Sequence, residues 1–448
     1  MAPQNATSAD SVARPQPGAW SRLRWPVLAA LYLALALLLS VVQPLGRTPD
    51  EGAHVQYIAF VADHHRLPLF LPAGGGEAGY EAQHPPLYYA VMAIPWRLSA
   101  GLEDRWRWQL LRWLTILLVG GGTFYICMRM FRRVWAAHDS LAWAATATTM
   151  LMPLTILYTG YINPDGMAML WATAAVCLSI EVAVSRPSHM RALALGMVLA
   201  AAALTKISAL PTALVAAVAF YLAAKRSGWR AVAPDAGIAL GALVAMSGWW
   251  YARNLYLYGS PLVKTAAPYG SGLDNALATG HAGFYAWLTI RETFLSSWAQ
   301  RGWFPAGALE YLLYAVILVY TIGAVVGWAA GRQSPGRITG ARLRRQRAAV
   351  GLMALLLAAV VAGQQAAFWL SDVEFNAGGR YVLMGMSGIA LLGLAGWARL
   401  LSRRWVLVAV GLWLVAIVVM DLASAWNIVA VLNPRYAPGW QLFHFPPG

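Results

Sequence analysis

The chain has 448 residues, of which 59% are hydrophobic and only 11% are charged. This composition excludes an ordinary soluble globule and predicts an all-α polytopic membrane protein. The net charge of +15 would favour nucleic acid in a soluble chain. Here the basic residues fall in short clusters between apolar runs, as the positive-inside rule expects, so we expect membrane lipid and no nucleic acid as a partner.

The first 21 residues are rich in Ala, Pro, Ser and Gln and show no apolar periodicity. They predict a disordered cytoplasmic tail ahead of a single integral membrane domain, residues 22–448. Arg22 and Arg24 then precede an apolar run over residues 25–42, which is too long for a typical cleaved signal core. This run predicts an uncleaved first span with the amino terminus inside.

Two adjacent acids and a histidine follow the first span, in the stretch Thr48-Pro49-Asp50-Glu51-Gly52-Ala53-His54. Thr48 and Glu51 have the spacing of a capping box, which predicts that a helix starts here. On that helix Asp50 and His54 would share a face, because they are four residues apart. Glu51 is explained equally well as a cap, whereas the box does not need Asp50, so Asp50 is the stronger catalytic candidate.

The apolar segment over residues 84–98 is short for a hydrocarbon layer about 30 Å thick. If it crossed the membrane, the basic cluster at residues 129–133 would lie outside, against the positive-inside rule. We therefore interpret it as a juxtamembrane helix. With the first span, eleven transmembrane helices are predicted, the others at residues 108–128, 139–159, 166–184, 190–205, 207–224, 234–252, 307–328, 348–370, 381–401 and 405–423.

In this topology the basic residues lie mostly inside and the acidic residues mostly outside. Most of the 33 basic residues fall inside, whereas the acidic residues inside are only Asp10, Asp139, Glu181 and Asp235 out of 18. The carboxyl terminus and three loops lie outside, at about residues 45–107, 253–306 and 371–380. Because acids hardly influence topology, their concentration outside indicates work done there, with a solvating loop face as the alternative.

Four further positions are costly in or near a bilayer. Asp165 lies in the predicted outer turn Asn163-Pro164-Asp165-Gly166, which also suits a plain turn and helix cap. Lys206 interrupts a long apolar run, and a lysine inside a membrane is a functional hypothesis by default. Arg253 and Arg380 lie at predicted outer ends of spans, where a snorkelling arginine is the alternative.

Together these positions predict one outward-facing group of acids, cations and imidazoles. A carboxylate could take the proton from an acceptor hydroxyl. Fixed cations could stabilise the charge that develops on a departing lipid phosphate. The pattern therefore favours group transfer from a lipid phosphate, with the residues Asp50, Glu51, Asp165, Lys206, Arg253, Arg380, His54 and His84.

The order of the motifs resembles a known family. The chain has Asp50-Glu51 after the first span, His84-Pro85-Pro86-Leu87-Tyr88-Tyr89, Asp165 after the third span, Leu204-Thr205-Lys206, and Trp250-Tyr251 followed by Arg253-Asn254. This resembles the GT-C glycosyltransferases, in particular the protein O-mannosyltransferase and lipid A aminoarabinose transferase branch and related bacterial membrane proteins. The resemblance covers about residues 26–400.

The resemblance implies a GT-C-like fold and an inverting glycosyltransferase. The donor would be a polyprenyl-phosphate-linked sugar and the acceptor a hydroxyl of a glycan, lipid or protein, on the outer face of the bacterial cytoplasmic (inner) membrane. Asp50 would be the general base and Glu51 its neighbour, with Asp165 as the second acidic loop. Donor-phosphate ligands would be Lys206, Arg253 and Arg380, and substrate contacts would come from His54, His84, Tyr88, Asn254 and Tyr381.

Two departures from the family pattern bear on charge and metal. His84 stands where relatives often have lysine, so a fixed positive charge is not assured there. Asp165 stands without a second acid two residues away, whereas hard cations want several oxygen ligands. We therefore assign no metal ligand and no certain cofactor, and a divalent cation stays an open alternative.

Two other functional classes fit parts of the pattern. A transporter or flippase of a lipid-linked or amphipathic substrate would use Lys206 and Arg380 along its pathway. No inverted repeat is evident in the sequence, and the outer loops are large, which both argue against it. If the chain were a noncatalytic assembly subunit, the positions of Asp50 and Lys206 would be unexplained.

Overall fold

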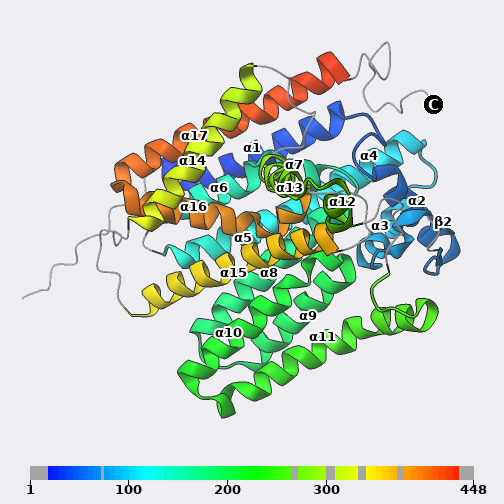
Figure 1. Ribbon diagram of the computed structural model, residues 1–448, viewed down its shortest axis with the longest axis horizontal. Coiled ribbons are helices and arrows are strands. Elements are labelled where there is room, and N and C mark those ends of the chain that lie inside the picture. The colour runs from blue at the N-terminus through cyan, green and yellow to red at the C-terminus, as the bar shows by residue number, and fades with distance from the viewer. Residues whose placement is uncertain are drawn as a thin grey trace, which may run out of the picture.

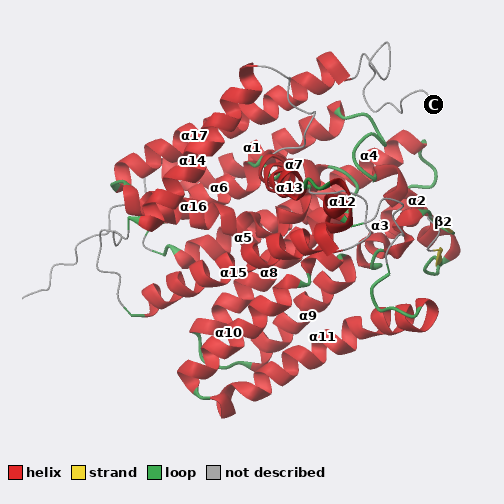
Figure 2. Ribbon diagram, viewed as in Figure 1, coloured by secondary structure: helices red, strands yellow, loops and turns green. Residues whose placement is uncertain are grey.

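The computed structural model describes residues 19–71, 75–136, 138–263, 271–298, 308–330, 340–370 and 378–432. Over these residues the chain is almost entirely helical (Figure 2), which confirms the all-α prediction. One short antiparallel pair joins β1 (Phe70–Leu71) and β2 (Gly75–Gly76). The predicted tail lies outside the described residues except for its last three, which already belong to the first helix.

Seventeen α-helices are described in these ranges. The first third of the chain forms α1 (Ala19–Val42), α2 (Glu51–His64), α3 (Leu87–Leu98), α4 (Asp104–Leu114) and α5 (Gly121–Val134). The middle forms α6 (Asp139–Leu151), α7 (Pro153–Gly160), α8 (Pro164–Val184), α9 (His189–Thr205), α10 (Pro211–Ser227) and α11 (Trp229–Tyr258). The last part forms α12 (Gly272–Thr279), α13 (Ala282–Ser296), α14 (Ala308–Ala329), α15 (Ala341–Leu370), α16 (Met386–Leu400) and α17 (Arg403–Asn427).

Nine helical segments within the described residues are long and apolar enough to cross a membrane, or ten if the bent pair α6 and α7 is one span. Every predicted span falls on an apolar helix. The fifth, at residues 190–205, matches α9, which is apolar but shorter than the other nine. The polytopic prediction is therefore confirmed, while the count of eleven depends on the bent pair and on α9.

Prolines and polar residues determine where the helices break. Helix α6 ends at Leu151 and α7 begins at Pro153 with a bend of 58°, because proline lacks the N–H that would continue the helix. Helix α9 ends at Thr205, and Lys206 has an extended backbone before Pro211 starts α10. The interruption predicted at Lys206 is thus a real break between two helices.

The elements of the first predicted outer loop gather at one end of the helical bundle (Figure 1, right). There α2 packs on α3, and the Tyr57 and Tyr89 rings stack with centroids 3.8 Å apart. Segment 84–98 forms the short α3 rather than a candidate span, as predicted. Helices α8 and α15 run through the middle of the bundle, and α9, α10 and α11 line one flank (Figure 1).

Candidate active site

Asp50 lies immediately before α2, with φ 63° and ψ 0° and no side-chain bond to the helix. This left-handed backbone is uncommon outside glycine, although aspartate tolerates it better than most residues. It turns the carboxylate away from the helix and toward the bundle, where Oδ2 accepts from Arg380 Nη1 at 2.7 Å and Oδ1 accepts from the Tyr80 hydroxyl at 2.9 Å. Partial burial would raise the pKa of Asp50, but Arg380 and Tyr80 outweigh it and hold that pKa below 3.8.

The predicted capping box is wrong, because Glu51 is the first residue of α2 and bonds elsewhere. Its side chain is fully buried against Arg112, whose Nε and Nη2 donate to the carboxylate at 2.8 and 2.6 Å. The backbone N–H groups of Gly46 and Ile162 donate to the same carboxylate at 3.0 and 3.2 Å. With all these donors and no exposed surface, Glu51 anchors the start of α2.

Arg112 holds the start of the site together, although the sequence analysis did not predict it as a site residue. Besides Glu51, it donates to the Ser40 and Gln43 carbonyl oxygens, both at 2.7 Å. It therefore fixes the end of α1 and the loop that carries Asp50 to one point on α4. The available signal was an arginine inside the predicted second span, since a charge at such a place marks a paired, structured site.

Asp165 and Lys206 meet in a buried ion pair. The Lys206 ammonium lies 2.7 Å from each Asp165 carboxylate oxygen, so two of its three N–H groups are used. Asn163 is the residue that caps α8, accepting from Gly166 N–H at 3.2 Å, which leaves Asp165 free to pair. Gly166 has no room for a side chain, because a Cβ there would meet the Tyr158 carbonyl.

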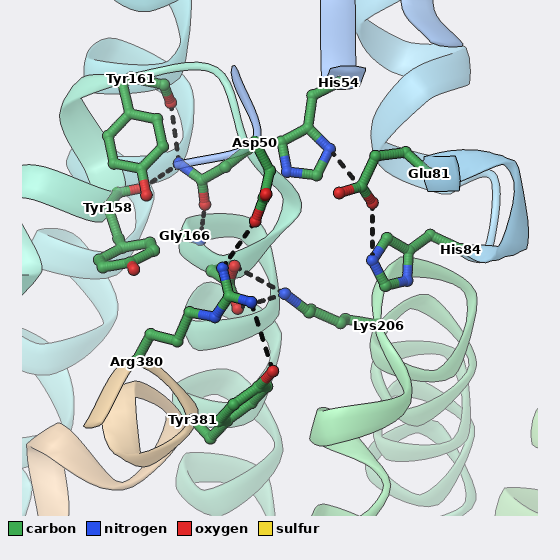
Figure 3. A network of polar contacts seen from close by, with 12 residues as sticks. Asp50, His54, Glu81, His84, Tyr158, Tyr161, Gly166, Lys206, Arg380 and Tyr381 are labelled. Carbon is green, nitrogen blue, oxygen red and sulfur yellow. Dashed lines mark hydrogen bonds and ion pairs between the residues drawn. The ribbon is translucent and has the colours of Figure 1, made fainter. Parts of the chain in front are cut away.

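Arg380 and Tyr381 come from the short 3-10 helix Gly379–Gly385 ahead of α16. Gly379 packs against the end of α13 so closely that a Cβ would meet the Ser297 backbone, and its N–H donates to Ser296 Oγ at 2.6 Å. This contact holds Arg380 over Asp50. The Tyr381 ring lies near both cations, 5.3 Å from the Arg380 guanidinium and 6.0 Å from the Lys206 ammonium (Figure 3).

Glu81 joins the two predicted histidines, a relationship that no sequence motif indicated. His84 Nε2 lies 2.8 Å from Glu81 Oε2, and His54 Nδ1 lies 3.6 Å from the same oxygen and 3.0 Å from the Tyr89 hydroxyl (Figure 3). Burial lowers the pKa of His54 below 6.5 despite the neighbouring Glu81. Burial would raise the pKa of Glu81, but the two imidazoles hold it well below 4.5.

Three of the predicted site residues lie elsewhere. Arg253 donates to the Pro68 carbonyl at 3.0 Å and lies over the Trp250 ring, so it ties α11 to the first loop. Asn254 is buried beside it and donates to the Pro261 carbonyl. Tyr88 is fully buried in the apolar cluster between α2 and α3, together with Ile58 and Met92. Its neighbour Tyr89 bonds to His54 instead, because successive helical residues point in different directions.

One group among the described residues could hold a metal ion. It consists of Asp50, His54 and Glu81, whose ligand atoms lie within 4.8 Å of one another. Two carboxylates and an imidazole would suit a zinc-like cation. However, Arg380 and Tyr80 already donate to Asp50, and His84 Nε2 lies 2.8 Å from the Glu81 carboxylate. The set fits a divalent ion only if these donors are displaced, and we assign no chemical step to one.

Comparisons with known proteins give distant structural similarity. No protein-family model matches the sequence, and no curated protein matches it. ArnT from Cupriavidus metallidurans in the apo state is similar over 93% of this chain and 80% of its own, with 17% identity and a TM-score of 0.47. The same protein bound to undecaprenyl phosphate gives 17% identity, a TM-score of 0.46, and coverage of 95% and 82%.

A second solved protein is also similar. It is the archaeal oligosaccharyltransferase AglB from Archaeoglobus fulgidus, in complex with an inhibitory peptide and a dolichol-phosphate, with 10% identity and a TM-score of 0.47. The match covers 92% of this chain but 56% of AglB, so the chain spans little more than half of that protein.

Proposed function

We propose that the chain is a GT-C glycosyltransferase that moves a sugar, with inversion, from a polyprenyl phosphate to an acceptor hydroxyl on the outer face of the cytoplasmic membrane. The observation that carries the proposal is the half-exposed Asp50 carboxylate beside Arg380, next to the Asp165–Lys206 pair. These residues come from four segments far apart in sequence. Asp50, Asp165 and Lys206 belong to the motif series quoted above, and Arg380 was predicted separately as an outer cation.

Asp50 is the base in this reaction. Its pKa lies below 3.8, so the carboxylate is ionised at neutral pH and can take the proton of the acceptor hydroxyl. The acceptor oxygen forms a bond to the anomeric carbon while the bond from that carbon to the phosphate oxygen breaks. The electron pair stays on the phosphate.

Arg380 and Lys206 stabilise the charge on the departing phosphate. Arg380 has five N–H donors in a planar fork, which suits phosphate oxygens, and Lys206 keeps one N–H that Asp165 does not use. Tyr381, near both cations, can donate its hydroxyl proton to the phosphate or pack on the sugar. The acceptor is a glycan, a lipid or a protein, and the lipid tail of the donor lies along the apolar helices.

The proposal is tested in the native host without knowing the sugar. Cells that lack this chain should accumulate one polyprenyl-phosphate-linked sugar, measured by mass spectrometry of extracted lipids. Wild-type protein should restore its turnover, whereas Asp50→Asn should not. If no such lipid accumulates, or if Asp50→Asn restores turnover fully, glycosyl transfer by this site is excluded and the transporter interpretation gains.

A further inference from the structure

Both oxygens of the Asp50 carboxylate have donors in this structure. Oδ2 has Arg380 at 2.7 Å and Oδ1 has the Tyr80 hydroxyl at 2.9 Å. Each oxygen still has a second lone pair, but a cation bonded to the carboxylate stabilises its charge and makes it a weaker base. Loss of the Arg380 bond would therefore make Asp50 a stronger base.

The two ion pairs of the site differ in how readily they can open. Asp165 and Lys206 are 2% and 8% exposed and share two short bonds, and separating such a pair would leave an uncompensated buried charge. Asp50 and Arg380 are 30% and 19% exposed and share one. Water and other anions can reach the second pair, so Arg380 is the cation that can change partners.

We infer that the donor phosphate takes Arg380 over from Asp50, so that binding of the donor itself frees the base. This inference rests on the function proposed above. The Arg380–Oδ2 hydrogen bond breaks and a bond from Arg380 to a phosphate oxygen forms, with no proton transferred in the exchange. Tyr80 keeps its hydrogen bond to Oδ1 and thus the orientation of the carboxylate, while Oδ2, without the cation, becomes more basic toward the acceptor's proton.

The exchange also sets the order of events. Among the described residues, the charged or titratable groups that interact with Asp50 include Arg380, Tyr80, Glu81, His54 and Tyr158. Of these, Arg380 alone is a fixed cation bonded to the carboxylate. When it turns to phosphate, Asp50 loses its main stabilising partner and becomes more basic while donor occupies the site. An acceptor that enters before the donor meets a weak base.

A double-mutant cycle on lipid binding tests the exchange. The probe is undecaprenyl phosphate, titrated against the purified full-length protein in nanodiscs. If Asp50 competes with phosphate for Arg380, Asp50→Asn should bind the probe roughly three- to tenfold more tightly than wild type. Arg380→Gln should bind it more weakly, and adding Asp50→Asn to Arg380→Gln should give no gain. Glu77→Gln, which removes the same charge from the exposed Arg66–Glu77 pair, is the matched control and should bind like wild type.

The outcomes separate this inference from the proposed function. If wild type does not bind the probe, the proposed function fails and the exchange fails with it. If wild type binds and Arg380→Gln weakens binding, but Asp50→Asn has no effect, the exchange is overturned while the proposed function stands. An equal gain from Asp50→Asn with and without Arg380 would mean simple charge repulsion and would also overturn it. Should Arg380→Gln aggregate, Arg380→Lys replaces it, since a lysine lacks the fork that joins carboxylate or phosphate.

Discussion

Glu51 and Arg112 form a buried two-pronged ion pair, with nitrogen–oxygen distances of 2.8 and 2.6 Å, that joins the first residue of α2 to α4. Both side chains are fully buried. Because Asp50 precedes Glu51 directly, the pair also holds the backbone next to Asp50. The two adjacent acids therefore lie in different environments: Glu51 is fully buried in an ion pair, whereas the Asp50 side chain is partly exposed.

Removal of one partner of this pair should destabilise the protein strongly. Glu51→Ala leaves the Arg112 guanidinium buried without its counter-charge, which costs about 3–5 kcal/mol. Thermal unfolding in detergent should show a large fall in the midpoint, and Glu51→Gln, which keeps the side-chain volume and part of the hydrogen bonding, should show a smaller one. The control is Glu77→Gln, which opens the exposed Arg66–Glu77 pair and should leave the midpoint unchanged. An equal effect of Glu77→Gln and Glu51→Ala would refute the anchoring role.

Lys206 and Arg380 should respond differently to truncation. Lys206→Ala leaves Asp165 charged and buried, so we expect a loss of folded protein that Asp165→Asn in the same chain partly restores. Arg380→Ala opens a more exposed pair and should fold, but it should bind undecaprenyl phosphate about tenfold more weakly or worse, because charge-assisted hydrogen bonds contribute about 1.5–3 kcal/mol. Size-exclusion profiles and lipid titration measure the two effects. If Lys206→Ala folded like wild type, the predicted difference between the buried and the exposed pair would be wrong.

Glu81 should make stability dependent on pH on the acid side. Its folded-state pKa lies below the unfolded value of 4.5, so its contribution is fully present above that pH and is lost as the pH falls toward the folded value. Glu81→Gln should therefore be less stable than wild type at neutral pH. The gap between the two unfolding midpoints should narrow as the pH falls below 4.5. A gap that is constant with pH would show that the Glu81 charge does not stabilise the fold.

Membrane sidedness is a separate prediction, which follows from the charge distribution of the sequence. In a chain with Cys127 and Cys177 replaced, single cysteines at Ala100 and Ala330 occupy exposed positions near opposite predicted sides. An impermeant thiol reagent applied to intact cells should label the cysteine at Ala100 and spare the one at Ala330. Labelling of the second position alone would reverse the predicted orientation.

Local sequence patterns were enough to predict the helices and some of the site residues. The break before Pro153, inside the predicted span 139–159, was not predicted. Apolar runs predict the helices, Lys206 marks a real break, and the bond between Asp50 and Arg380 joins two residues chosen from sequence. These features depend on neighbouring residues or on the bilayer's strong penalty for charge. Asp165 and Lys206 were also chosen, but as separate groups rather than as partners.

The sequence did not indicate which residues far apart in the chain would form ion pairs. The Glu51–Arg112 pair spans 61 residues and the Asp165–Lys206 pair spans 41, and their contact depends on how α2, α4, α8 and α9 pack. The prediction of a capping box at Glu51 was wrong because the buried Arg112 binds the carboxylate more strongly than a helix amide could. Arg253, Asn254 and Tyr88 had suitable chemistry, but packing turned them toward the first loop or the core.

Asp50→Asn tests the central claim most directly, since it keeps the size of the side chain and removes its basicity. Membranes that carry the variant should retain binding of undecaprenyl phosphate while turnover of the accumulated lipid-linked sugar falls roughly 10²–10⁴-fold, the usual share of general-base catalysis. Glu51→Gln, assayed alongside on the folded fraction, should lose far less. Near wild-type turnover by Asp50→Asn, with Glu51→Gln inactive although folded, would contradict the assignment of Asp50 as the base.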